Sequence, residues 1–225
     1  MRIALRVEYD GTGFFGWQIQ KDGRSVQQCL EEALSKIADH EIRVVCAGRT
    51  DTGVHALGQI VHFDTDAERP ERAWTLGINS ELPDDISVRW ARVVADDFHA
   101  RYEARSRQYS YLFHNDKLRS ALLRNRAWWV RRVLDPDAMN EAASALVGRH
   151  DFSAFRAAGC QARSPIREVS DIRVVRIDQR LIRLDVTANA FLHHMVRNIA
   201  GTLAMVGRGE KDQGWVASLL AGRDR

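Results

Sequence analysis

The segment from Gly48 to Ala56, with the sequence Gly-Arg-Thr-Asp-Thr-Gly-Val-His-Ala, contains the residues best suited to chemistry. Arg49 precedes Asp51 by two positions, so on an extended backbone both side chains leave the same face. A guanidinium that close favours the ionised carboxylate, which can attack an electrophilic carbon directly. The same spacing is typical of an Asx-turn, in which Asp51 bonds its own backbone before Gly53. From spacing alone, this structural role is favoured.

A second candidate is the aromatic stripe of Tyr109, Tyr111 and Phe113. These residues alternate along a predicted strand and therefore share one face. Most such stripes pack into a core. In the functional interpretation one ring stacks on a nucleic-acid base, with its phenol available for proton transfer. Alternation does not choose among the three.

The basic residues are concentrated between His99 and Arg132. The whole chain has a formal net charge of +3, whereas this segment has nine Lys or Arg and two Asp or Glu, a net charge of +7. The remainder of the chain is therefore at −4. Tyrosine, phenylalanine and tryptophan are interleaved with these cations. This mixture favours a surface that neutralises phosphates and stacks bases over a merely solvated face.

No metal site or cofactor is predicted. The three cysteines are far apart and form no C-x-x-C pair. His193 and His194 are adjacent, so on a helix they point about 100° apart, and they lack the spacing of a zinc-binding helix. The Gly11-Thr-Gly13 sequence lacks the remaining residues of a phosphate-binding loop.

Membrane insertion and secretion are not predicted either. No apolar run approaches the ~18 residues that a membrane helix needs. The first nine residues alternate apolar and charged side chains, unlike a secretory signal. We therefore expect a soluble, cytoplasmic protein.

The periodicity of the sequence predicts a similar order of strands and helices in the two halves. Strands are expected at 3–9, 42–47, 58–64, 86–94, 105–114, 127–131, 166–177 and 181–188. Helices are expected from a Ser25/Gln28 capping box to about Ala38, after Pro70, from Asp135-Pro136 to Gly148, over 190–206, and from Gln213.

This order predicts an α+β fold in a single catalytic domain of two similar lobes, approximately residues 1–98 and 99–225. We expect the lobes to share a mostly antiparallel mixed sheet with helices on one face. A cleft is expected at the lobe junction.

Five motifs, in order, resemble the tRNA pseudouridine synthase A family. They are Tyr9–Gln18, Gly48–Ala56, His99–Tyr111, Asp151–Arg156 and Asn189–Asn198. The match spans essentially the whole chain. An ordered set of five motifs is far more specific than any one of them.

The resemblance implies the pseudouridine synthase fold and a cofactor-free, homodimeric isomerase. Its implied substrate is uridine at nucleotides 38 to 40 of the tRNA anticodon stem-loop. It assigns Asp51 as the nucleophile, Arg49 as a salt-bridged neighbour that helps hold the flipped site open, and Tyr109 as the ring that stacks on the uracil. Similar proteins continue with a further helix and strand, so we expect this chain to be truncated at Arg225.

Other residues of these motifs and of the basic segment are expected to bind the substrate. They are Asp10, Thr12, Trp17, Gln18, Thr50, His55, Arg101, Arg105, Arg107, Arg156 and Arg197.

Two alternatives belong to different classes of protein. A non-catalytic RNA-binding module would bind tRNA with a steep salt dependence and leave it chemically unchanged. An aspartic-protease-like dimer is suggested by the tripeptide Asp51-Thr52-Gly53. Arg49 argues against the protease, because its charge opposes the shared-proton carboxylate pair that such a site requires.

Overall fold

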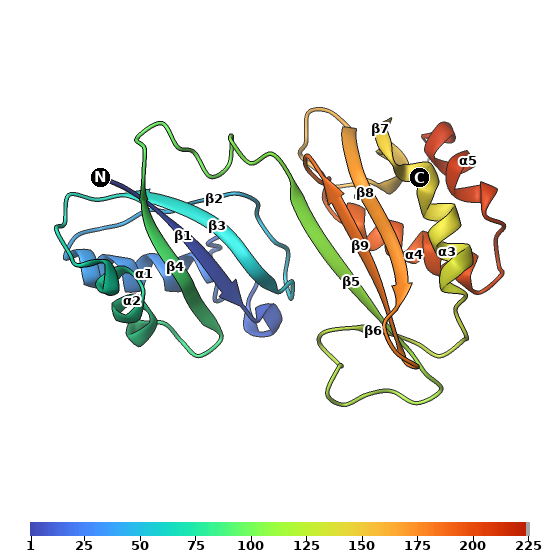
Figure 1. The fold of residues 1–225 in the computed structure, drawn as a ribbon, viewed down its shortest axis with the longest axis horizontal. Coiled ribbons are helices and arrows are strands. Elements are labelled where there is room, and N and C mark those ends of the chain that lie inside the picture. The colour runs from blue at the N-terminus through green and yellow to red at the C-terminus, as the bar shows by residue number, and fades with distance from the viewer. Residues whose placement is uncertain (224–225) are drawn as a thin grey trace. The chain divides into compact units, whose positions relative to one another are not determined.

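The computed structural model describes residues 1–223 (Figure 1). The chain divides into two compact units, Met1–Ala104 (unit 1) and Arg105–Arg225 (unit 2). The expected truncation at Arg225 concerns a position outside the described residues. Across residues 1–223 we find no helix with the length and apolar character needed to span a bilayer.

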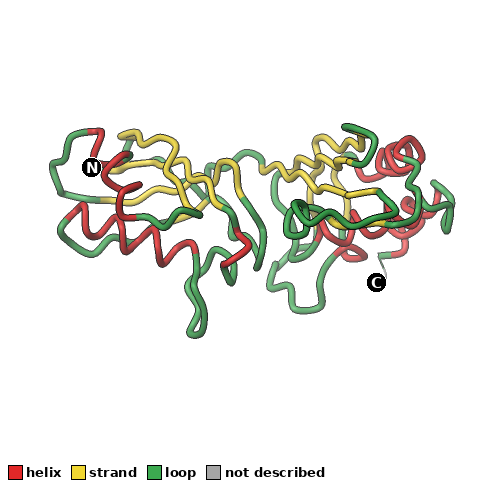
Figure 2. Tube along the Cα trace, turned by 90° about the horizontal axis from the view of Figure 1, so that it is seen from below, coloured by secondary structure: helices red, strands yellow, loops and turns green. Residues whose placement is uncertain are grey.

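Unit 1 contains a four-stranded antiparallel sheet in the order β2-β3-β1-β4. Its strands are β1 (Arg2–Tyr9), β2 (Val45–Cys46), β3 (Ala56–Asp64) and β4 (Ile86–Val94). Its helices are α1 (Val26–Ala38) and α2 (Leu76–Glu81), with the 3-10 turns η1 (Gly11–Gly13) and η2 (Glu71–Trp74). Figure 2 shows helix packed along one face of this sheet.

Alternation and capping explain the core of unit 1. Ile3, Leu5 and Val7 in β1 are buried at every second position and pack with the apolar stripe of α1. Ser25 caps α1 as predicted, because its Oγ accepts the backbone N–H of Gln28 at 3.3 Å. The Gln28 side chain donates to Glu32 instead of closing the other half of a capping box.

Unit 2 contains a five-stranded sheet in the order β6-β5-β9-β8-β7, in which only the β5–β6 pair is parallel. Its strands are β5 (Arg107–Asn115), β6 (Trp128–Val130), β7 (Gly148–Asp151), β8 (Ile166–Arg176) and β9 (Leu181–Ala188). Its helices are α3 (Pro136–Ala143), α4 (Met195–Gly207) and α5 (Gly214–Gly222), with the turns η3 (Ser144–Leu146) and η4 (Ser153–Phe155).

The α+β class is confirmed. Every second residue of β9 is buried, and these residues share one core with α3, α4 and α5, so the helices cover one face of the sheet. The strands form two sheets, one in each unit, and not the single shared sheet that we expected. Each sheet has its own helices and its own apolar core.

Some predicted boundaries were wrong for identifiable reasons. The strand expected at 42–47 is only Val45–Cys46, because the Ile42 and Val44 N–H groups donate to Ser35 and Glu31 of α1 rather than to a strand. The helix expected to reach Gly148 ends at Ala143, and η3 follows it. Gly148 begins the unpredicted strand β7, which pairs with β8.

The helix expected from 190 begins only at Met195. His194, its N-cap, has a left-handed backbone with φ of 59°, which interrupts any helix before it. The carbonyl of His193 accepts the Ala157 N–H at 3.0 Å, so a tertiary contact occupies this stretch of backbone.

Candidate active site

Asp51 lies in the turn that connects β2 to β3. The Val54 N–H donates to the Asp51 carbonyl at 3.1 Å and closes the turn. Gly53 within it has φ of +77°, a conformation that favours glycine. The Asp51 side chain is exposed, so a carboxylate is presented at the surface of unit 1.

A second loop, residues 10–17, fixes this turn by close backbone contact. A Cβ added to Gly11 would lie 2.1 Å from the Val54 carbonyl oxygen. One added to Gly16, whose φ is +90°, would lie 2.7 Å from the Thr50 carbonyl oxygen. That oxygen accepts the Trp17 N–H at 3.0 Å. Glycine at both positions lets the two loops pack with no side chain between them.

Polar side chains join the same two loops. The Tyr9 hydroxyl and Thr50 Oγ1 share a hydrogen bond of 2.8 Å. His55 Nδ1 accepts the Gly11 N–H at 3.1 Å and lies 3.1 Å from Asp10 Oδ1. That carboxylate oxygen also accepts the Thr12 N–H at 3.0 Å. The Asp51 turn is thus held on both sides of the carboxylate.

The expected salt bridge between Arg49 and Asp51 is not formed. Within residues 1–223, no carboxylate lies at ion-pairing distance from the Arg49 guanidinium. The backbone turns at 51–54, so the rule that residues two apart share a face, which holds for extended chain, does not apply. The charge of Arg49 acts instead on Cys46, where it opposes the burial that raises the pKa of this thiol to about 11.

In unit 2 the aromatic stripe of β5 divides into three environments. Phe113 is fully buried in the core. Tyr111 is half-buried with its ring 5.3 Å from that of Phe113, and burial raises the pKa of its phenol against the opposing charge of Arg197. Tyr109 is half-buried and meets the edge of Phe191 with ring centroids 5.0 Å apart.

The candidate arginines differ in what they contact. Arg101, Arg105 and Arg197 are exposed, and the Arg101 guanidinium lies 5.9 Å from the centre of the Tyr102 ring. Arg107 donates to the Asn189 carbonyl at 2.6 Å. Arg156 donates to the carbonyls of Cys160 and Ala162 at 2.5 and 2.9 Å. Arg156 therefore holds its own loop, residues 156–162.

Two histidines hold the segment that carries Arg101. The Nδ1 atom of buried His62 accepts the Ala100 N–H at 3.1 Å. The Nδ1 atom of His99 accepts the N–H groups of Arg101 and Tyr102 at 3.2 and 3.1 Å. Both imidazoles act as acceptors here, so both Nδ1 atoms are unprotonated in this arrangement.

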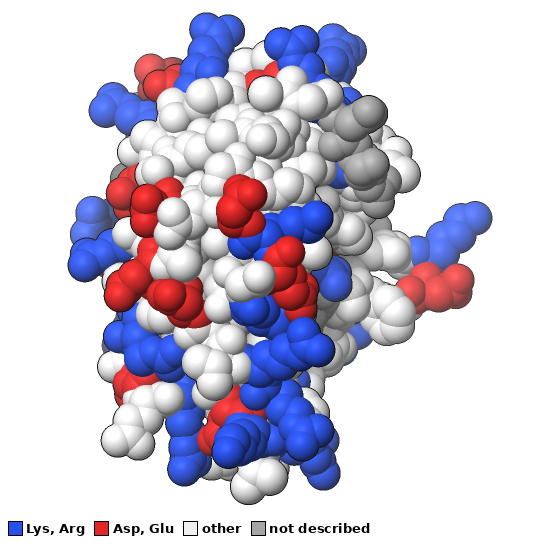
Figure 3. Space-filling view, turned by 90° about the vertical axis from the view of Figure 1, so that its right-hand side faces the viewer, with Lys and Arg blue, Asp and Glu red and all other residues white. Residues whose placement is uncertain are grey.

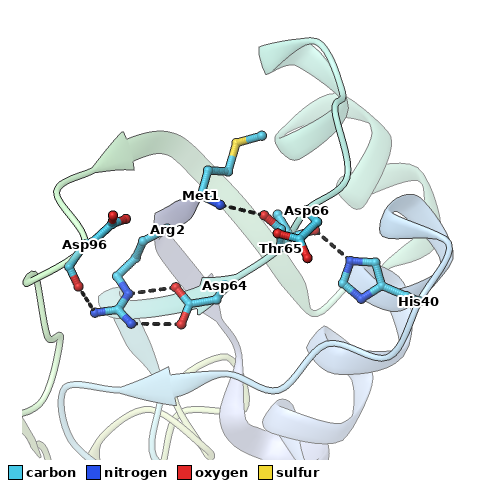
Figure 4. A pocket seen from close by; sticks show the side chains of 7 residues that line it. All are labelled: Met1, Arg2, His40, Asp64, Thr65, Asp66 and Asp96. Carbon is cyan, nitrogen blue, oxygen red and sulfur yellow. Dashed lines mark hydrogen bonds and ion pairs between the residues drawn. The ribbon is translucent and has the colours of Figure 1, made fainter.

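The pocket in Figure 4 lies at the opposite end of β1 from the Asp51 turn. Arg2 binds both carboxylate oxygens of Asp64 at 2.8 Å and also donates to the carbonyls of Asp96 and Phe98. The Met1 ammonium donates to the Thr65 carbonyl at 2.8 Å. These contacts tie the strand ends together and anchor the beginning of the Arg101 segment.

Comparison with known proteins identifies the family. Residues 5–103 and 142–225 match the family described as tRNA pseudouridine synthase. The whole chain is 58% identical to the tRNA pseudouridine synthase A of Pseudoalteromonas atlantica and covers 85% of that protein. It is 56% identical to the protein of that name from Shewanella woodyi and 52% identical to that from Aeromonas hydrophila, covering 86% and 83% of them. The chain belongs to the tRNA pseudouridine synthase family.

In unit 1 of this tRNA pseudouridine synthase family member, most of the expected site residues lie on or beside two contacting loops, and one is buried. In unit 1, two contacting loops bring together Asp10, Thr12, Thr50, Asp51 and His55. Gln18 is exposed beside them in sequence. Trp17 is different, because it is only 1% exposed and packs in the core near Tyr9. Its side chain therefore supports the loop and is not available to bind substrate, which corrects our expectation.

The sequence did not predict that several further residues hold the candidate site residues of this family member in place. They are Tyr9, Gly11, Gly16, His62 and Phe191. The two glycines had a visible signal, since glycine recurs in the loop that follows β1. Phe191 lies in the fifth motif, Asn189–Asn198, but nothing in the sequence indicates its contact with Tyr109, because the two positions are far apart in the chain.

Proposed function

We propose that this chain isomerises uridine to pseudouridine in tRNA, with Asp51 as the nucleophile. The observation that carries this proposal is the exposed carboxylate on a turn braced by Gly11, Gly16 and Tyr9. Membership of the tRNA pseudouridine synthase family supports it independently. A turn whose backbone is held in this way fixes the position from which the carboxylate attacks, and that favours its use as a nucleophile.

The reaction detaches uracil from ribose and reattaches it through a different atom. The C1′–N1 bond breaks, the uracil turns, and a C1′–C5 bond forms. Asp51 attacks either C1′ of the ribose or C6 of the uracil and is released when the new bond is complete. The C5 proton passes to a base and N1 gains a proton, so the product has the same atoms as the substrate.

We assign the aromatic role to Tyr109. Its half-buried ring packs at right angles to Phe191, with ring centroids 5.0 Å apart, and the part of the ring exposed to solvent is proposed to stack on a uracil. Its phenol is the base that we propose for the C5 proton. Phe113 is enclosed by the core and has no hydroxyl, and burial raises the pKa of the Tyr111 phenol, so less of it is ionised and able to accept a proton near neutral pH.

The exposed arginines are proposed to bind the RNA backbone. Arg101, Arg105 and Arg197 present guanidinium groups that suit phosphate oxygens. Because a stacked uridine is inaccessible, it must leave its helix at a cost of a few kcal/mol, which stacking and phosphate contacts offset. Arg49, which has no carboxylate partner among the described residues, is proposed to help hold the flipped site open.

We further propose the anticodon stem-loop as the region of tRNA that reacts and the homodimer as the working form. Both rest on the resemblance of the five motifs. Mapping the modified nucleotides in tRNA and measuring the mass of the protein in solution test them separately.

The deciding experiment compares the unaltered chain with Asp51→Asn on unmodified tRNA. Carbodiimide labelling maps pseudouridine, and filter binding measures affinity. We expect pseudouridine only with the unaltered chain and similar affinity for both proteins. Substantial product from Asp51→Asn would refute the nucleophile. Bound but unchanged tRNA with the unaltered chain would instead indicate a non-catalytic RNA-binding module.

A further inference from the structure

Unit 2 carries a dense group of cations in the loop between β5 and β6 and immediately after β6. We call it the β5–β6 surface and define it by its exposed cations, which are Lys117, Arg119, Arg124, Arg126, Arg131 and Arg132. The segment lies at the lower end of unit 2 in Figure 1. Lys and Arg side chains gather at the lower end of the face shown in Figure 3.

Most of this charge is not balanced locally. Elsewhere arginines meet carboxylates, as Arg24 does with Asp85 at 2.7 Å. In the β5–β6 surface Arg132 binds Glu210 at 2.9 Å. Four other cations have no carboxylate at ion-pairing distance among residues 1–223, namely Lys117, Arg119, Arg124 and Arg131.

The acidic residue of the segment does not offset these four charges. The Asp116 carboxylate accepts the Leu118 N–H at 3.1 Å and pairs with Arg180 of the β8–β9 turn at 3.0 Å. The Leu118 N–H, followed by Arg180, lowers the pKa of Asp116, so the carboxylate is ionised and already engaged.

The loop backbone is ordered before any partner binds. The Ala127 N–H donates to the Leu123 carbonyl at 3.0 Å. The Trp129 indole N–H donates to the Asp116 carbonyl at 2.9 Å. A loop whose backbone is held by hydrogen bonds loses less freedom on binding than a flexible one, which favours a specific docking surface over a solvated charged loop.

We propose that the β5–β6 surface binds phosphates of the tRNA body, outside the stem-loop that reacts. Asn115 lies six positions after Tyr109 along β5, which at about 3.3 Å per residue places the loop about 20 Å from Tyr109. A nucleic-acid duplex advances by at most about 3.4 Å per nucleotide of each strand, so the surface lies about six base pairs from the reacting base. This inference rests on the proposed function, through the role given to Tyr109.

A second copy of this chain is a less suitable occupant. Leu118 and Leu122 on the same loop are 76% and 90% exposed, which by itself would suit a protein contact. A two-fold symmetric interface would place this surface against itself. Four unbalanced positive charges would then face four others, and this repulsion costs free energy. Binding of a polyanion carries no such cost.

The test compares full-length unmodified tRNA with its isolated anticodon stem-loop. The variant replaces Lys117, Arg119, Arg124 and Arg131 with Gln. We expect the ratio of kcat/KM for tRNA to kcat/KM for the stem-loop to fall by about 10- to 100-fold. The salt slope of tRNA binding should decrease by about three to four, close to one for each lost phosphate contact.

A matched variant controls for loss of charge alone. It replaces four other exposed arginines that also lack a carboxylate partner among the described residues, namely Arg72, Arg89, Arg149 and Arg173. It should leave the substrate ratio unchanged. Equal ratios and salt slopes in the two variants would overturn the proposal, as would a change from one oligomeric state to another in the first variant alone.

The proposed function can fail separately. If the unaltered chain modifies neither substrate, the isomerase assignment is wrong, while the salt slopes still decide whether the β5–β6 surface binds tRNA. Thermal unfolding of both variants verifies that they are folded. We expect the β5–β6 variant to fold because the four cations that it loses make no ion pair within the described chain.

Discussion

The Tyr9 hydroxyl lies 2.8 Å from Thr50 Oγ1, which connects the end of a core strand to the residue immediately before Asp51. Tyr9 is 3% exposed, so its ring cannot shift without disturbing the core of unit 1. The orientation of the Asp51 turn is therefore coupled to the core of that unit.

Tyr9→Phe should reduce kcat by about three- to tenfold and leave KM for tRNA nearly unchanged. The reason is that a buried hydrogen bond contributes about 1 kcal/mol, and here it orients a turn that carries the proposed nucleophile. Steady-state kinetics separates the two constants. Thr50→Val should have a similar effect, and the double variant should be no worse than either single one. Additive losses would indicate that the pair does not act as a unit.

Gly16→Ala should abolish most of the activity and lower the free energy of unfolding by about 1–3 kcal/mol. The new Cβ would meet the Thr50 carbonyl at 2.7 Å, and the backbone has φ of +90°. Urea denaturation and pseudouridine mapping measure the two effects. Gly201→Ala in α4 is the control, because its Cβ would meet nothing within 4 Å and alanine favours helix. Full activity of Gly16→Ala would show that the loop contact is dispensable.

Tyr109→Phe and Tyr111→Phe should differ in kcat. Removing the phenol of Tyr109 should lower kcat by about 10²-fold or more, as expected for loss of a general base. Tyr111→Phe should stay within a few-fold, because the Tyr111 phenol is partly enclosed by the core. Tyr109→Leu should also weaken binding, since it removes the stacking ring. Single-turnover assays with tRNA measure the chemical step. An equal loss for the two phenylalanine variants would contradict the assignment.

Unfolding should become easier as pH falls from about 7 to 5. Burial, then the charges of Arg2 and His99, lower the pKa of His62 below its ordinary value, while Asp64 opposes them. The unfolded chain therefore takes up a proton near pH 6.5 that the folded chain resists, and stability is lost as pH falls below 6.5 through the folded pKa. Urea denaturation across this range measures the slope.

His62→Gln provides the comparison for that pH dependence. Glutamine keeps an acceptor for the Ala100 N–H but does not titrate. Its stability should change less between pH 7 and 5 than that of the unaltered chain. Asp64 does not contribute to the slope in this range. Arg2 lowers the pKa of Asp64, so the effect of Asp64 on stability appears only in more acidic solution, below the ordinary pKa of an aspartate. Parallel pH curves for the two proteins would exclude His62 as the source.

Glu31→Leu should lower the free energy of unfolding by about 2–4 kcal/mol. The Glu31 carboxylate is buried and accepts the Val44 N–H at 2.9 Å, the Gln27 amide at 2.9 Å and Arg43 at 3.0 Å. Leucine would leave the Val44 N–H without an acceptor. Urea denaturation measures the loss. Glu32→Leu, on the exposed side of the same helix, should cost less than about 0.5 kcal/mol, and an equal cost would contradict this account.

Sequence patterns correctly predicted those helices and strands in which the local preference of the residues agrees with their tertiary contacts. The apolar alternation in Ile86–Val94 gave that strand its correct bounds, and the hydroxyl of Ser25 marked the beginning of α1. The elements that failed depend on distant partners. Gly148 forms a strand because β8 is beside it, and Val44 leaves the sheet because Glu31 accepts its N–H. No window of local sequence contains these partners.

The sequence pointed to Asp51 through the resemblance of five ordered motifs, whereas the spacing of Arg49, Asp51 and Gly53 alone favoured a structural Asx-turn. Only the tertiary structure decided how the turn that carries this carboxylate is held. The Gly11, Gly16 and Tyr9 contacts hold its backbone, the expected Arg49 salt bridge is not formed, and Trp17 is buried. The physical reason is that residue chemistry is local, whereas burial and close backbone approach arise only when distant segments pack together.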